Sequence, residues 1–294
     1  MRKNTKSKDM KSNLLLLLAS LLPAAGHAHE HLAAGATAPN PGATLVLQNL
    51  ADYGEASGYA FNLGAGTTND AYLGYYYTGD LVFVALAATP NYGGPEPGAA
   101  ALGAFVQIQL LSVEGPPGAS FGFWETTQDG VDSTDLTWSV PVPYTNGHRL
   151  IPVSEGDGTA GADPYGHLHG RIYSVTRPGL YKTTWQFVDT SANGPAGHPV
   201  ELPSAPFSLF LQADLTLGRV VLSTNGLALT FAAPSNIPDS GDGPATNYRL
   251  EASPVLGPAA AWTAVGDVVV GDDHLHTVTV PWSGSTRFFR LSVL

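Results

Sequence analysis

The apolar residues of this chain fall in short runs separated by clusters of Gly, Pro, Asn and Asp. The runs are rich in Val, Thr, Tyr, Phe and Leu, which favour strands, and no window shows a convincing helical period with capping residues. Frequent turn signals between short strands are typical of a sandwich. The pattern therefore predicts an all-β protein, with its clearest strands at 44–48, 81–87, 104–111, 120–124, 167–173, 180–188 and 207–212.

A second series of short strands follows a boundary near residues 215–219. Its predicted members are 226–231, 248–253, 261–265, 274–280 and 286–291. We expect residues 29–215 to form an antiparallel β-sandwich, and residues 216–294 to form a smaller immunoglobulin/fibronectin III-like β-sandwich.

The first 28 residues have the features of a secretory signal peptide. A basic stretch is followed by the apolar run 14–22, then by Pro23 and by Gly26-His27-Ala28, which suits a small-x-small cleavage site. The run is shorter than the ~20 residues that span a bilayer, although an uncleaved N-terminal anchor is the alternative. We expect a secreted or extracytoplasmic protein without a membrane span in the mature chain.

Charge and cysteine content narrow the classes of function. Residues 1–28 hold five of the 13 basic residues and one of the 24 acidic residues, so removal of the leader leaves eight and 23 and a formal net charge of −15. Nucleic-acid binding needs Lys and Arg for the phosphates, so this balance argues against it. The chain has no Cys, which excludes thiol catalysis and cysteine-ligated zinc or iron–sulfur sites.

The strongest chemical signal is Gly166-His-Leu-His-Gly170, at the start of the predicted strand 167–173. Alternate residues of a strand share a face, so His167 and His169 would point the same way, together with Arg171 and Tyr173. Their spacing of roughly 6.5–7 Å along a strand allows both imidazoles to lean toward one ion. Two exposed histidines can also occur at this spacing without binding anything.

A zinc site needs a third and usually a fourth ligand. The candidates are His148 in the preceding turn, His198 in a later loop, and acidic residues of the Gly- and Pro-rich loop 152–164. That loop and the similar loop 89–101 are long for a compact domain, which is typical of functional or mobile segments.

The expected mature N-terminus offers a separate possibility. Cleavage after Ala28 would leave His29-Glu30-His31, whose amino group, backbone amides and third-position imidazole can wrap a square-planar Cu(II) or Ni(II) ion. His29 and His31 could otherwise lie in a flexible, His-rich end.

Other chemistries have weaker support. The nucleophile elbow Gly-x-Ser-x-Gly, the phosphate-binding loop and the dinucleotide-binding fingerprint are all absent from the sequence, so we expect no enzyme and no catalytic residues. A second His-x-His pair, His274 and His276, has the pattern of edge or surface residues. A group of aromatic residues could line a sugar platform, although packing in the core explains them as well: Tyr72, Tyr75, Tyr76, Tyr77, Phe121, Phe123 and Trp124.

Three segments of the region 45–213 carry a family resemblance. They are 166–173, containing the histidine pair, 177–189, beginning Arg-Pro-Gly-Leu-Tyr, and 204–213, with Phe121-Gly-Phe-Trp-Glu125 as a further landmark. The region resembles a secreted bacterial family that is repressed by the zinc-uptake regulator and carries a PEP-CTERM sorting signal. It is also similar to a surface-anchored repeat domain of actinobacterial proteins linked to metal-transport operons. The Pro-Gly-Leu-Tyr motif is similar to the tyrosine corner of sandwich domains.

The resemblance implies zinc handling outside the cytoplasm, with His167 and His169 as ligands. We therefore expect a non-catalytic protein that binds zinc or another divalent transition metal, with cell-surface or metal-transport components as partners. The alternative is a structural or adhesive surface protein whose histidines have no metal role. A carbohydrate-binding module is the remaining alternative.

Overall fold

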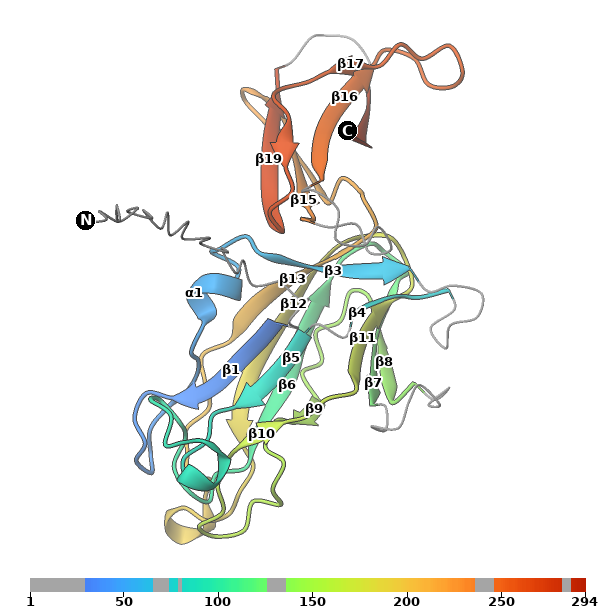
Figure 1. Cartoon of the computed structure of the whole chain (residues 1–294). Coiled ribbons are helices and arrows are strands. Elements are labelled where there is room, and N and C mark those ends of the chain that lie inside the picture. The colour runs from blue at the N-terminus through green and yellow to red at the C-terminus, as the bar shows by residue number, and fades with distance from the viewer. Residues whose placement is uncertain (1–29, 66–73, 79–80, 126–135, 236–245, 282–286) are drawn as a thin grey trace, which may run out of the picture.

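The structure is a computed structural model that describes residues 30–65, 74–78, 81–125, 136–235, 246–281 and 287–294. The fold is all-β, as predicted, and its described helices are single turns: α1 (Leu50–Tyr53), η1 (Pro90–Tyr92) and η2 (Pro195–Gly197). Strands before residue 214 and strands after it pair in separate sheets (Figure 1). The expected signal peptide, residues 1–28, lies outside the described residues.

Two sheets face each other in the first part of the chain. The smaller has the order β10-β5-β1-β2 and consists of β1 (Glu30–Ala36), β2 (Leu45–Leu47), β5 (Leu81–Ala85) and β10 (Gly166–His167). The larger has the order β8-β7-β11-β4-β3-β13-β12-β6-β9. Its strands are β3 (Ala60–Ala65), β4 (Tyr76–Thr78), β6 (Val106–Glu114), β7 (Ser120–Glu125), β8 (Trp138–Pro141), β9 (Arg149–Pro152), β11 (Arg171–Val175), β12 (Gly179–Asp189) and β13 (Phe207–Ala213).

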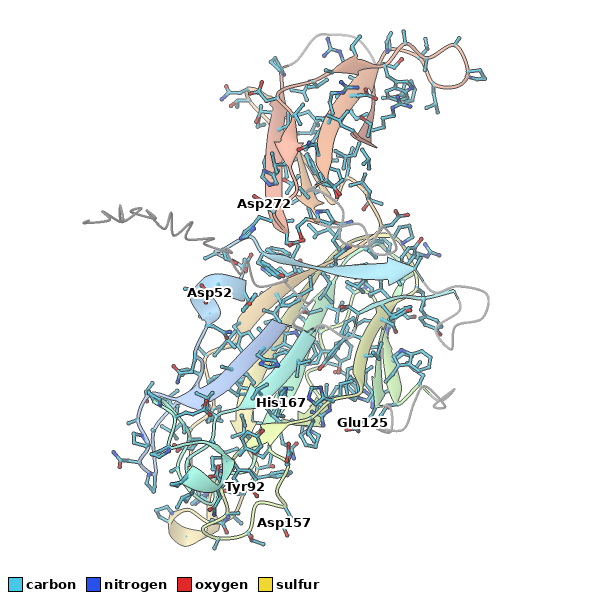
Figure 2. The ribbon with its side chains drawn as sticks, in the orientation of Figure 1. Asp52, Tyr92, Glu125, Asp157, His167 and Asp272 are labelled. Carbon is cyan, nitrogen blue, oxygen red and sulfur yellow. The ribbon has the colours of Figure 1, made fainter. Side chains whose placement is uncertain are left out.

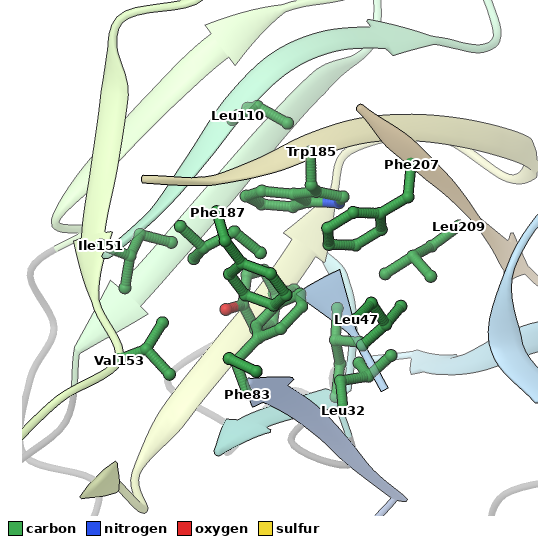
Figure 3. Packing of buried hydrophobic residues seen from close by; sticks show 14 of the residues in the cluster. Leu32, Leu47, Phe83, Leu110, Ile151, Val153, Trp185, Phe187, Phe207 and Leu209 are labelled. Atoms are coloured by element: carbon green, nitrogen blue, oxygen red, sulfur yellow. The ribbon is translucent and has the colours of Figure 1, made fainter. Parts of the chain in front are cut away.

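Aromatic side chains fill the space between these sheets (Figure 3). Phe83 projects from β5 and packs on two residues of β12, with ring centroids 5.7 Å from Trp185 and 6.0 Å from Phe187. The alternation along β12 explains this arrangement, since its odd-numbered residues are buried and its even-numbered residues are half-buried. Packing in the core between the two sheets therefore holds β5 in place.

The predicted strand 167–173 is wrong as a single element. Residues 166–167 form β10, which pairs with β5, whereas residues 171–175 form β11, which pairs with β7 and β4 of the other sheet. The chain crosses between sheets at Leu168-His169-Gly170, where Gly170 has φ 78°. A positive φ suits glycine and ends the regular alternation of the strand. His167 and Arg171 therefore do not share one strand face.

The strands after residue 218 form two small sheets of their own. One has the order β14-β15-β19; in the other, β16 pairs with β17, β18 and β20. The strands are β14 (Arg219–Ser223), β15 (Gly226–Ala233), β16 (Asn247–Ser253), β17 (Thr263–Ala264), β18 (Val269–Val270), β19 (His274–Val280) and β20 (Phe288–Val293). Leu229, Leu250 and Val280 form one of their two small buried clusters.

Backbone hydrogen bonds connect the two parts of the chain. The Ala60 amide donates to the Asp273 carbonyl oxygen at 2.7 Å, and the Leu275 amide donates to the Gly58 carbonyl oxygen at 2.8 Å. The connection lies at the first residues of β3 and β19. Across the described residues, we find no helix with the length and apolar character needed to cross a membrane.

Candidate metal centre

β5 lies between the two strands that carry the histidines. His31 of β1 is in register with Val82, and His167 of β10 is in register with Val84. Paired residues project from the same side of a sheet, and so do residues two apart along one strand. His31 and His167 therefore project from the same outer face of the sheet, across β5 from each other. Val82 lies on this face and is only 5% exposed.

The two imidazoles meet above β5. His31 Nε2 lies 3.1 Å from His167 Nε2, and the ring centroids are 4.6 Å apart with an angle of 82° between the planes. The strands that carry them are two strand spacings apart, about 9–10 Å, so both side chains lean inward. At this distance the N–H of one imidazole can donate a hydrogen bond to the unprotonated nitrogen of the other.

His169 adds a third imidazole beside this pair. Its ring centroid lies 4.3 Å from that of His167, with an angle of 43° between the planes. It is exposed and belongs to the crossover between the sheets rather than to a strand. Its backbone therefore belongs to no β-ladder.

The backbone of His167 is held from the side opposite β5. The His167 amide donates to Glu155 Oε1 at 2.9 Å, and the Glu155 amide donates to the Tyr165 carbonyl oxygen at 2.9 Å. Gly166 makes this close approach possible, because a Cβ at that position would collide with the Val153 carbonyl oxygen. The acidic loop 152–164 thus positions His167 through a side-chain carboxylate that binds its backbone amide.

Arg171 lies on the buried side of the crossover, contrary to the predicted shared face. Its side chain is 6% exposed, forms an ion pair with Glu125 at 3.0 Å and donates to the Pro152 carbonyl oxygen. Tyr173 is buried in the aromatic core, and burial raises the pKa of its hydroxyl well above the ordinary value. Neither residue faces the histidine cluster.

The geometry of the His31–His167 pair fits a shared ion. Nitrogens bound to one tetrahedral zinc ion at ~2.0–2.1 Å lie about 3.3 Å apart, close to the observed 3.1 Å. Among the described residues, no group of three or more His, Cys, Asp or Glu side chains is arranged to hold an ion as it stands. A three-nitrogen site would therefore require His169 to rotate toward the pair.

The other expected ligands lie elsewhere in the structure. His148 precedes β9, and its amide donates to Tyr144 Oη at 3.2 Å; His198 ends the turn η2. Both are exposed, and within the described ranges neither ring contacts the three clustered histidines. His29 lies outside the described residues.

His31 occupies a strand rather than a flexible end. β1 starts at Glu30, and its residues Glu30–Ala34 pair with β5. A square-planar Cu(II) or Ni(II) site at the chain end would also need residue 29, which lies outside the described residues. The sequence signal that could have identified His31 as the partner of His167 is the second His-x-His spacing, at residues 29–31. The following residues, mostly Ala and Gly, gave no strong indication of a strand.

The second His-x-His pair lies at the junction of the two parts of the chain. His276 Nε2 is 2.9 Å from Asp272 Oδ1, and the His274 ring packs edge-on against Tyr59 with centroids 5.5 Å apart. These contacts are separate from the cluster around His167.

The aromatic residues expected as a sugar platform are mostly internal. Phe121 and Phe123 are at most 1% exposed, and Trp124 is 3% exposed, with its indole N–H donating to Ser174 Oγ at 2.7 Å. Tyr75, Tyr76 and Tyr77 are half-buried, and Tyr72 lies outside the described residues. The three most buried rings therefore serve the core.

No protein-family model matches the chain, and no curated protein matches it significantly.

Proposed function

We propose that this chain is a non-catalytic, extracytoplasmic protein that binds zinc or another divalent transition metal through His31, His167 and His169. The observation that carries the proposal is the 3.1 Å separation of the His31 and His167 Nε2 atoms. These atoms come from strands on opposite sides of β5. His169 supplies a third nitrogen, and a water molecule completes a tetrahedral site.

The chemistry of the cluster supports zinc or a similar ion. Imidazole nitrogens are good ligands for zinc, copper, nickel and iron, and poor ligands for calcium or magnesium, which prefer oxygen. The formal net charge of −11 favours cations over anions near the protein. The family resemblance of residues 45–213 and the leader-like N-terminus support a role outside the cytoplasm, where metal-transport or cell-surface components would be the partners.

Isothermal titration calorimetry with ZnCl₂ on chelator-treated protein tests this proposal. The wild type should bind one ion, whereas the His31→Ala/His167→Ala variant should show no saturable heat at the same concentrations. His198→Ala is the matched control, because it removes an exposed histidine outside the cluster. Equal heats from the wild type and the double variant would remove the site as proposed.

A further inference from the structure

Hydrogen bonds connect three loops at one end of the first sandwich: the loops around residues 88–103 and 152–164, and the loop that carries Asn193. The Gly103 amide donates to the Ala162 carbonyl oxygen at 2.7 Å, and Asn193 Nδ2 donates to the carbonyl oxygens of Gly103 and Gly158, each at 2.7 Å. The Ala88 amide donates to Asp163 Oδ1 at 3.0 Å. The long loops 89–101 and 152–164 therefore form a preorganised surface. Preorganisation lowers the entropy cost of binding a ligand.

A pair of stacked tyrosines lies on this surface. The rings of Tyr92 and Tyr165 are nearly parallel, with centroids 4.8 Å apart and 17° between the planes. Tyr92, on the turn η1, is 53% exposed, whereas Tyr165 is half-buried beneath it. Because Tyr165 covers one face of the Tyr92 ring, the exposure falls on the opposite face. Figure 2 labels Tyr92 and Asp157 at this end of the molecule.

Two carboxylates belong to the loops that carry the stack: Glu96 follows Tyr92 in the loop 89–101, and the Glu155 amide donates to the Tyr165 carbonyl oxygen at 2.9 Å. Glu96 Oε2 accepts the Ala87 amide at 2.7 Å, and Glu155 Oε1 accepts the His167 amide at 2.9 Å. These bonds fix both side chains, and within the described residues the second oxygen of each makes no hydrogen bond. Burial raises the pKa of Tyr165, and the charges of Glu155 and Glu96 raise it further, which is consistent with their lying close to the stack.

We propose that the exposed face of Tyr92, on loops that also carry Glu96 and Glu155, is a binding platform for a neutral sugar ring of a polysaccharide. One face of a pyranose carries C–H groups that stack on an aromatic ring, and its edge carries hydroxyls that donate to carboxylates. The open face of the Tyr92 ring complements the first feature, and the carboxylates of the same loops supply acceptors for the second. This surface uses none of the aromatic residues singled out in the sequence, and it does not depend on metal binding.

Affinity electrophoresis tests the platform. Native gels would contain soluble hydroxyethylcellulose, xylan, galactomannan or glycol chitin, with EDTA present so that the histidine cluster holds no metal. The wild type and Tyr92→Phe should be retarded in at least one gel, whereas Tyr92→Ala should bind the same polysaccharide about tenfold more weakly. Leu102→Ala, which truncates a 47% exposed side chain on one of the three connected loops, should behave as the wild type.

Either of two results overturns the proposal: unretarded wild type in all four gels, or equal retardation of the wild type and Tyr92→Ala. Circular dichroism establishes that each variant is folded. Because the gels contain EDTA, a negative result for polysaccharide binding would not affect the proposed metal site.

Discussion

His31 and His167 are 136 residues apart in the chain, yet their Nε2 atoms lie 3.1 Å apart above β5. The contact depends on three strands in register, since β1 and β10 both pair with β5. An ion held there would join β1 to β10 across β5. Binding at this position should therefore stabilise the folded state.

Zinc should raise the unfolding temperature of the wild type. An ion that binds only the folded state stabilises it by about 2.7 kcal/mol when its free concentration is 100 times Kd. In differential scanning fluorimetry, the increase should persist in His198→Ala and disappear in His31→Ala/His167→Ala. A full increase in the double variant would place the stabilising ion elsewhere.

Gly166→Ala should destabilise the fold and weaken metal binding. The new Cβ would meet the Val153 carbonyl oxygen, so β10 must move away from the loop that holds His167. Overpacking of this kind costs ~1–3 kcal/mol. Urea unfolding measures the loss.

Gly156→Ala is the matched control for Gly166→Ala, because the nearest atom to its new Cβ, apart from its chain neighbours, would be the Asp163 carbonyl oxygen at 3.8 Å. It should leave stability within ~0.5 kcal/mol of the wild type. Similar losses in the two alanine variants would show that the close approach at Gly166 does not matter.

Tyr181→Phe should lower stability at neutral pH. The Tyr181 hydroxyl donates to the Arg177 carbonyl oxygen at 2.7 Å, which confirms the tyrosine-corner geometry expected from the sequence. Loss of the bond should cost about 1 kcal/mol in urea unfolding. An unchanged unfolding midpoint would contradict a stabilising role for this hydrogen bond.

The same residue should make stability sensitive to alkali. Burial raises the pKa of Tyr181 from 10.0 to about 12. The folded state therefore keeps its proton at a pH where the unfolded chain loses it. This contribution is complete below pH 10 and is lost as the pH rises from 10 through about 12. The fall in stability over this window should be shallower in Tyr181→Phe than in the wild type; identical slopes would argue against the raised pKa.

Phe83→Ala should strongly destabilise the first sandwich. Phe83 is 3% exposed and packs on Trp185 and Phe187 across the space between the sheets. Truncation of a buried Phe costs ~3–5 kcal/mol, because a cavity remains. Leu102→Ala, at a 47% exposed position, should change stability little. Comparable urea midpoints for the two variants would mean that Phe83 does not couple the sheets.

The sequence was sufficient to predict the class of fold and many of the strands. Runs such as Leu81–Ala85 and Phe207–Ala213 combine β-branched or aromatic residues with clear turn signals, so local pattern and tertiary structure agree. β1 was missed because four of its seven residues are Ala or Gly, which are poor strand formers. Its position depends on pairing with β5 and on burial of Leu32 and Ala34.

The site was only partly predictable. Spacing suggested that His167 and His169 lie close together, and the structure brings their rings together at a crossover instead of along one strand. The neighbour of His167 could not be chosen from the sequence, because contact with His31 depends on the order of strands in the sheet. His148 and His198 were also candidates for the further ligand, and the sequence offers no means of choosing among these histidines.

X-ray absorption at the zinc edge, combined with anomalous diffraction from zinc-loaded crystals, tests the central claim most directly. The account predicts one ion bound at ~2.0–2.1 Å to the Nε2 atoms of His31 and His167, with an imidazole nitrogen of His169 as a further ligand. An ion coordinated away from β5, or a zinc-saturated crystal with no anomalous peak between His31 and His167, would contradict it.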